Sequence, residues 1–404
     1  MSTLQELKDK WFVDVSQGDS FPPQTRHRVS KIQPSSDGNL VESLIDGAAI
    51  MGDFHYRAEK MLNCDNPEDC LIIVAAMGID PVKLLGENGP AKGGPTHDLA
   101  LKVQGPAVAD VVQTFQERWN DPSSAEGTSL PIQEAMPDYF RDLPIPRTGP
   151  HSVQVLRSFP LIKKRKGYSW SDQGEYTIWA AYLKAIKQAQ QYIYIEDQYL
   201  FTFHDPPFFE MSTGVRRDTD IVYQLGEALK RGVDVVALVP GRNNAIWKHY
   251  EIQQRRRAAE YLQGISAASP DHGEFVICKL HIDGKDPTIH SKLMLVDDAY
   301  TLAGSVNICQ RSIAYITELQ LGVVDEQDRL AKELRLALWQ EHLELDSPDR
   351  LLNPRDAVGE YRENAAAGKG RLRLLPAKRF KPEFPYRFLF NQIVNPYSGP
   401  ERGS

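Results

Sequence analysis

The stretch from Ile289 to Asn307 constrains the fold of this chain more than any other. An apolar run, Leu293 to Val296, is followed by a turn and by a second run that ends in Gly304-Ser305-Val306-Asn307. This pattern predicts two neighbouring buried strands that carry polar groups where they end. His290 and Lys292 are two positions apart, so on a strand their side chains face the same side.

These residue types suit the transfer of a phosphodiester. A neutral imidazole such as His290 can attack phosphorus and form a phosphohistidine, which water or an alcohol then cleaves. Lys292 supplies a point charge for the non-bridging oxygens, and Ser305 and Asn307 add hydrogen-bond donors. A carboxylate must fix the tautomer of the histidine. Glu318 is the candidate, because it begins the next predicted strand. No metal or organic cofactor is implied.

The rest of the chain shows a weak internal repeat. A segment with helical spacing precedes a nearly continuous apolar run twice, as Tyr56–Leu62 with Leu71–Ala76 and as Tyr182–Ala189 with Tyr192–Ile195. The apolar runs are typical of strands that are buried on both faces. The sequence therefore predicts an α/β protein with two similar halves around one cleft, residues 1–150 and 151–404. The boundary falls in a polar, proline-containing connector.

The composition narrows the classes of function. A net charge of −7 argues against a strongly basic nucleic-acid binder. No run of about 18 apolar residues exists, so no membrane span is predicted. The first residues, Met1 to Asp14, lack the apolar core of a signal peptide, so ordinary secretion is not encoded there. A cytoplasmic location and export by another route both stay open.

The spacing of the polar residues resembles a known signature. His290-x-Lys292, four residues, Asp297, six residues and then Gly304-Ser305-x-Asn307 is similar to the HKD motif of the phospholipase D superfamily. Glu318 stands where that family has a glutamate that orients the histidine. The resemblance implies two αβα halves, with central mixed sheets flanked by helices and an active-site cleft between the halves. It places His290, Lys292, Asp297 and Glu318 at the catalytic centre, where Asp297 fixes the geometry of the motif.

The activity implied is that of a phosphodiesterase. It would hydrolyse the headgroup of a glycerophospholipid, or transfer it to an alcohol, through a phosphohistidine. The alternatives are a cardiolipin-synthase-like phosphatidyltransferase, a nuclease of the same superfamily, or an inactive homologue that binds lipid or a partner. The expected partners are a phospholipid substrate and, transiently, a membrane surface. No nucleic-acid partner is expected, and the chain is expected to be a monomer.

The resemblance extends to two other segments. Tyr192 to Tyr199 resembles the segment before the second motif of two-motif phospholipases D, and Thr96-His97-Asp98-Leu99 resembles the segment after their first motif. The likeness suggests His97 as a substrate-binding residue, and the place of Gln198 at a strand end suggests the same. Thr96 replaces a usual tryptophan, and Ile316 replaces an aspartate that is often found there.

A second motif is missing. In that family each half carries one, but of the ten histidines only His290 begins a His-x-Lys-x-x-x-x-Asp pattern. Ninety-seven positions separate Ile193 from His290, whereas 25 separate the equivalent Ile72 from His97. The block for the first motif is therefore absent, and a Gly/Pro-rich loop at residues 86–95 stands at the join.

Three explanations of this gap stay open. The 404 residues omit a segment of the full protein, or the chain is a truncated form without activity, or two copies pair so that two His290 residues meet. His290 would be the general acid if a lost motif held the nucleophile, and the nucleophile otherwise.

Overall fold

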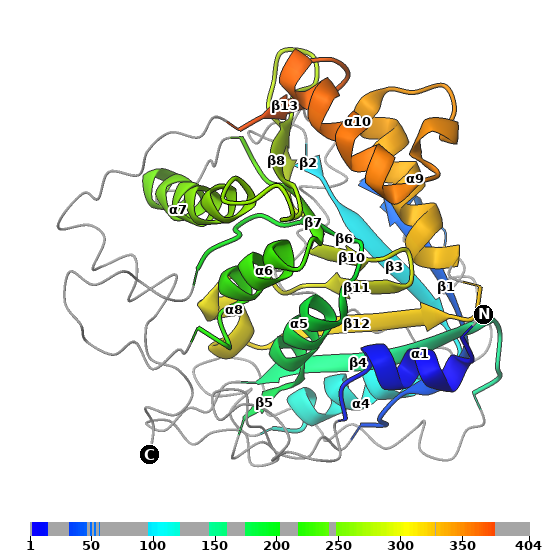
Figure 1. Ribbon diagram of the computed structural model, residues 1–404. Helices are drawn as coiled ribbons and strands as arrows, with labels where there is room; N and C mark the ends of the chain where they lie inside the picture. Colours follow the sequence, from blue (N-terminus) through cyan, green and yellow to red (C-terminus); the bar gives the residue numbers. More distant parts are fainter. Residues whose placement is uncertain are drawn as a thin grey trace, which may run out of the picture.

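The computed structural model describes residues 2–14, 32–46, 49–50, 52–53, 56, 96–121, 145–159, 174–202, 217–241, 248–327 and 329–375. In this part of the chain the fold is α/β, with one large mixed sheet and helices packed on it (Figure 1). The α/β class predicted from the apolar runs is thereby confirmed. No helix in these ranges is both long enough and apolar enough to span a membrane.

The large sheet has the strand order β13-β8-β7-β6-β10-β11-β12-β4-β1-β3, and β5 pairs with β4. These strands are β1 (Ser36–Ile45), β3 (Leu99–Gln104), β4 (His151–Phe159), β5 (Glu175–Tyr176), β6 (Tyr192–Glu196), β7 (Asp234–Leu238), β8 (Phe275–Leu280), β10 (Leu293–Val296), β11 (Tyr300–Gly304), β12 (Glu318–Asp325) and β13 (Leu372–Leu374). A separate parallel pair joins β2 (Thr96–His97) to β9 (Thr288–Ile289).

Helices cover both faces of the sheet. They are α1 (Leu4–Trp11), α4 (Ala107–Trp119), α5 (Thr177–Gln188), α6 (Ile221–Lys230), α7 (Lys248–Ser266), α8 (Gln310–Ala314), α9 (Arg329–Leu343) and α10 (Pro354–Ala367), with a short 3-10 turn at Asp349–Leu351. Ile193 and Ile195 of β6 lie in one core cluster with α1, α5 and α6. Tyr192 and Tyr194 lie in the opposite one with α9 and α10. The β6 strand is therefore buried on both faces, as its unbroken apolar run predicted.

The described residues of segment 1–150 extend this same sheet. The β1 strand pairs antiparallel with β4, and β3 pairs with β1. The α1 helix packs against residues from the later part of the sequence, and Trp11 stacks on Tyr300 with ring centroids 5.4 Å apart. The predicted strand Leu71–Ala76 and the loop at 86–95 lie outside the described residues, and the division at residue 150 stays a prediction.

Asp297 holds the hairpin between β10 and β11. Asp297 and Asp298 have φ angles of 54° and 57°, as tight hairpin turns require. The Asp297 carboxylate accepts hydrogen bonds from the backbone N–H groups of Gln190 and Gln191, both at 2.8 Å, and Tyr192 at 3.0 Å. Because all of β10 separates it from Lys292, about 13 Å along a strand, Asp297 lies away from His290. It acts on the backbone at the start of β6, in keeping with its predicted part in fixing the geometry of the motif, while its place among the catalytic residues stays a prediction.

Replacement of this carboxylate tests its structural part. We expect Asp297→Ala to lower the free energy of unfolding by about 1 to 3 kcal/mol, because three backbone N–H groups, of which that of Tyr192 is partly buried, lose their charged acceptor. Urea unfolding followed by circular dichroism measures this change.

Asp283 provides the matched control, since it is exposed and also has a positive φ, 49°. Asp283→Ala meets the same backbone cost without the hydrogen bonds, and we expect a loss of no more than about 1 kcal/mol. Equal losses in the two variants would show that Asp297 contributes backbone conformation alone.

Candidate active site

The residues His290 to Lys292 connect two strands rather than forming one. The β9 strand ends at Ile289 and β10 begins at Leu293, so the single strand predicted through His290 and Lys292 is wrong. The reason is that β9 leaves the large sheet to pair with β2, whereas Leu293 pairs with Glu196 and Ala303. In this connection the Lys292 ammonium donates a hydrogen bond to the carbonyl of His290.

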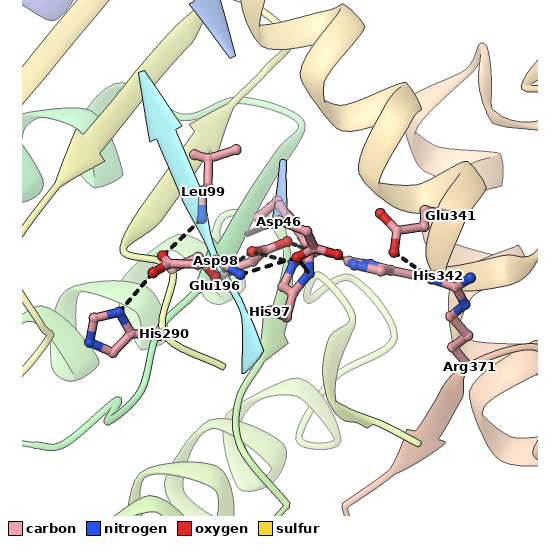
Figure 2. A network of polar contacts seen from close by, with 11 residues as sticks. Asp46, His97, Asp98, Leu99, Glu196, His290, Glu341, His342 and Arg371 are labelled. Carbon is pink, nitrogen blue, oxygen red and sulfur yellow. Dashed lines mark hydrogen bonds and ion pairs between the residues drawn. The ribbon is translucent and has the colours of Figure 1, made fainter. Parts of the chain in front are cut away.

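His290 is the exposed member of the site. Its side chain is 38% exposed, and its Nδ1 lies 2.9 Å from Oδ2 of Asp98. Its backbone N–H donates to the carbonyl of His97 at 2.8 Å. A carboxylate beside Nδ1 favours the tautomer that carries the proton there, which leaves a lone pair on Nε2. Asp98 therefore occupies the position predicted for Glu318 (Figure 2).

Glu318 contacts a different group. Its Oε2 accepts from the hydroxyl of Ser305 at 2.5 Å, and the same hydroxyl accepts from the N–H of Leu319 at 3.1 Å. The pairing of β11 with β12 sets Gly304 opposite Gln320, which brings Ser305 and not His290 next to Glu318. The prediction that Glu318 holds the ring of His290 therefore does not match this structure.

The carboxyl group of Glu318 is nearly enclosed. Its residue is 6% exposed, and burial raises the pKa of Glu318 to about 7, although the Ser305 hydrogen bond and the Lys292 charge act in the opposite direction. Near neutral pH this group therefore exchanges a proton. Asn307 lies close along the chain, and its buried Oδ1 has no hydrogen-bond partner among the residues that the structure describes.

Lys292 is the cation of the site. It is 7% exposed, and burial lowers the pKa of its ammonium, whereas the carboxylates of Asp197, Asp98 and Glu318 raise it. Asp197 is fully buried and accepts from the N–H groups of Tyr199 at 2.7 Å and Ile308 at 2.9 Å. Burial raises the pKa of Asp197 to about 6. Lys292 thus sits as a compact positive charge among acidic groups, where a phosphate would meet it with most of its water already removed.

His97 was predicted to bind substrate, but it is closed off from solvent. It is 2% exposed, with Nδ1 at 2.8 Å from Asp46 and Nε2 at 3.1 Å from Glu196. Burial alone would lower the pKa of His97, but the two carboxylates raise it to about 10. Both ring nitrogens are therefore committed within the protein. Gln198 is half-buried and accepts from Nη1 of Arg255 through its carbonyl at 3.3 Å, while the role of its side chain stays a prediction.

Two groups of described side chains come near enough to hold a metal ion. They are His97 with Glu196 and His342, and His97 with Asp46 and Glu341, each with ligand atoms within 4.8 Å of one another. In both groups the nitrogen that His97 would offer already pairs with a carboxylate. The ion pairs account for these clusters, and no metal enters the chemistry derived below.

The sequence reasoning missed Asp98 as a functional residue. Asp98 and His290 are 192 positions apart, so no local spacing relates them. One signal in the sequence pointed to Asp98: it lies next to His97, in the segment that resembles the one after the first motif of phospholipases D.

Comparisons with known proteins agree with the motif. Residues 182–340 match the family model described as "Cardiolipin synthase, PLD-like domain", and residues 82–204 match the one described as "Phospholipase D". Phospholipase D A of Dictyostelium discoideum is 28% identical over 296 residues, which cover 62% of this chain and 21% of that protein. Phospholipase D alpha 2 of Oryza sativa subsp. japonica is 26% identical over 360 residues, which cover 69% of this chain and 43% of that protein.

The chain thus spans less than half the length of these two relatives. Among solved structures, it is similar to the phospholipase D family member Nuc from Salmonella typhimurium, with 22% identity, a TM-score of 0.29 and coverage of 47% of this chain and 92% of that one. It is also similar to the phosphatidylserine synthase of Haemophilus influenzae, with 16% identity, a TM-score of 0.33 and coverage of 56% and 47%. The two matching family models include the HKD motif at His290, the segment at His97 and the segment at Tyr192, and the chain belongs to the phospholipase D superfamily.

Proposed function

We propose that this chain is a phosphodiesterase of the phospholipase D type, which removes or transfers the headgroup of a glycerophospholipid. The observation that carries the proposal is the contact between Nδ1 of His290 and the carboxylate of Asp98, on a histidine that is 38% exposed. A nucleophilic imidazole needs this combination of a fixed Nδ1 proton and an accessible Nε2.

In the proposed reaction, Nε2 of His290 attacks phosphorus while the bond from phosphorus to the headgroup oxygen breaks, and this oxygen takes a proton from water. Asp98 stabilises the positive charge that develops on the ring as the N–P bond forms. Lys292 binds the non-bridging oxygens, and the Asn307 amide adds a donor. Water then attacks the phosphohistidine to give phosphatidate, or an alcohol attacks it to give a new phospholipid. The membrane surface is a transient partner in this proposal, and the chain acts as a monomer.

Ser305 and Glu318 form a unit within this proposal. The Ser305 hydroxyl donates its hydrogen bond to Glu318 at 2.5 Å. This hydroxyl can donate to a phosphate oxygen only when the Glu318 carboxyl no longer accepts that hydrogen bond. With a pKa of about 7, Glu318 is protonated in part near neutrality. We therefore assign Ser305 to phosphate binding and Glu318 to control of the hydroxyl, in place of the role of Glu318 in orienting His290.

Phosphatidyl transfer is the second candidate. The model that matches residues 182–340 is described as a cardiolipin synthase domain, which favours an alcohol acceptor over water. Both candidates share the first chemical step, so the ratio of phosphatidate to transfer product, measured with glycerol or phosphatidylglycerol added, decides between them.

We expect His290→Ala to lower turnover of phosphatidylcholine vesicles at least about 10³-fold, because the nucleophile is lost. Asp98→Asn should lower kcat about 10²-fold or more, because the ring loses its orienting charge. Choline release measures both. A short-chain substrate labelled at phosphorus should leave an acid-labile phosphatidyl group, bonded through phosphorus to His290, on the wild-type protein after rapid denaturation.

His281 and Asp286 are the matched controls. Nδ1 of His281 lies 2.8 Å from Asp286, and its side chain is 34% exposed, so the pair resembles His290 and Asp98 outside the proposed site. We expect His281→Ala and Asp286→Asn to retain activity within about threefold. If the wild-type chain shows no turnover, the proposed activity is wrong, and the alternative of an inactive homologue that binds lipid or a partner is favoured.

The burial of Glu318 makes stability depend on pH. Between about pH 4.5 and pH 7 the folded protein keeps a proton on Glu318 that the unfolded chain has released. The free energy of unfolding therefore falls as pH rises through this window. We expect Glu318→Gln, which cannot ionise, to be more stable than the wild type by about 1 to 3 kcal/mol at pH 8, with little difference at pH 4.5. Urea unfolding at the two pH values measures this.

Glu326→Gln, at an exposed glutamate next to β12, is the control and should unfold like the wild type at both pH values. A Glu318→Gln variant that is less stable than the wild type at pH 8 would mean that the charged form is favoured by its surroundings.

A further inference from the structure

We propose that the buried cluster of Asp46, His97 and Glu196 positions Asp98, and through it His290, so that His97 is a positioning residue of the reaction rather than a ligand of the substrate. The consequence for kinetics rests on the proposed function. The coupling between His97 and the ring of His290 does not.

The side chain of His97 joins two elements that lie far apart in the sequence. Asp46 follows β1, the strand next to the edge of the large sheet, whereas Glu196 ends β6 near its centre. The ring of His97 bridges them at 2.8 Å and 3.1 Å, and both His97 and Glu196 are at least 98% buried. A buried charge that loses its partner costs several kcal/mol, so the ring and the two carboxylates are stable only as a set.

The backbone carries this position to His290. Oδ1 of Asp46, which contacts the ring of His97, also accepts from the N–H of Asp98 at 3.2 Å. Oδ1 of Asp98 accepts from the N–H of Leu99 at 2.9 Å, so Oδ2 is the oxygen that meets Nδ1 of His290. The carbonyl of His97 holds the N–H of His290 at 2.8 Å. Asp98 therefore cannot shift without disturbing Asp46 and His97 (Figure 2).

Glu196 holds the other side of the same histidine. Its Oε2 accepts from the hydroxyl of Ser291 at 2.5 Å, and Ser291 is the residue next to His290. The pairing of β2 with β9 sets His97 beside Ile289. By its contact with His97, Glu196 thus fixes the segment that carries Asp98. By its contact with Ser291, it fixes the segment that carries His290. The distance between acid and imidazole is set by one buried carboxylate.

The surroundings keep the charge on His97. From β6, Tyr194 donates to Oε1 of Glu196 at 2.7 Å. From α9, His342 lies with its ring 5.2 Å from that of His97, and burial lowers the pKa of His342 to about 3, so it is neutral. Glu341 of α9 and Arg371 before β13 complete the charged groups around the cluster in the described residues. The imidazolium of His97 is the cation that Asp46 and Glu196 share.

The test compares His97→Gln and Asp46→Ala with the wild type in the full chain. The first keeps an N–H toward Glu196 but removes the charge. The second removes a carboxylate that is 41% exposed and leaves the buried pair of His97 and Glu196 in place. Nitrogen-15 NMR of histidine side chains reports the tautomer of His290, with its signals assigned through His290→Ala. Steady-state kinetics with phosphatidylcholine vesicles give kcat and KM.

We expect both variants to convert His290 from the Nδ1–H tautomer to a mixture, and to lower kcat about 10- to 100-fold with KM within about twofold. His151→Gln is the control, because His151 is also buried and bonds the β1 backbone, but at Asn39 and Val41 rather than at the end of β1 that precedes Asp46. It should lose stability while the His290 signals and kcat stay as in the wild type.

An unchanged His290 tautomer in both variants would overturn the proposal, as would a loss of kcat that only follows the fraction unfolded. If the wild type shows no turnover but the tautomer shifts as expected, the proposed function fails and the positioning by His97 stands. If the wild type turns over substrate but the His290 tautomer is unchanged in both variants, the proposed function stands and the positioning by His97 fails.

Discussion

The buried carboxylate of Glu196 is the interaction on which the site depends. It ends the central strand of the sheet and is fully buried, yet burial, which disfavours its charge, is outweighed by His97, and the pKa of Glu196 falls to about 2. An ionised group at such a place must be fully paired. Its partners are Tyr194 on the same strand, His97 on β2 and Ser291 after β9. Two short segments that could not form a stable sheet by themselves are thus drawn to the end of β6.

What the sequence predicted well was local. The apolar runs at β6 and β10 are buried on both faces, and the order of polar residues around Lys292 identified the motif, because unbroken apolar runs and short spacings are visible in a single stretch. The partner of His290 was not local, since Asp98 comes from 192 positions away. Glu318 was chosen for its closeness in sequence, but strand register directs its side chain to Ser305. The strand predicted through His290 was wrong for a similar reason, because an unforeseen pairing with β2 ends it at Ile289.

The contact between Asp98 and His290 also bears on the missing motif. Here Asp98, a residue before position 150, contacts the histidine of the later part of the chain. The acid, the imidazole and the ammonium of one motif are therefore together in the described residues.

The N-terminal helix gives the fold a temporal order. The apolar side of α1 packs onto α5 and the strands of the later part, and Trp11 stacks on Tyr300, 289 positions away. At a synthesis rate of 5 to 20 residues per second, Tyr300 is made about 15 to 60 s after Trp11. During that interval Leu7 and Trp11 lack the surface that buries them. Among the described helices, α1 is therefore the earliest in sequence, yet it can reach its final packing only after β11 has been made.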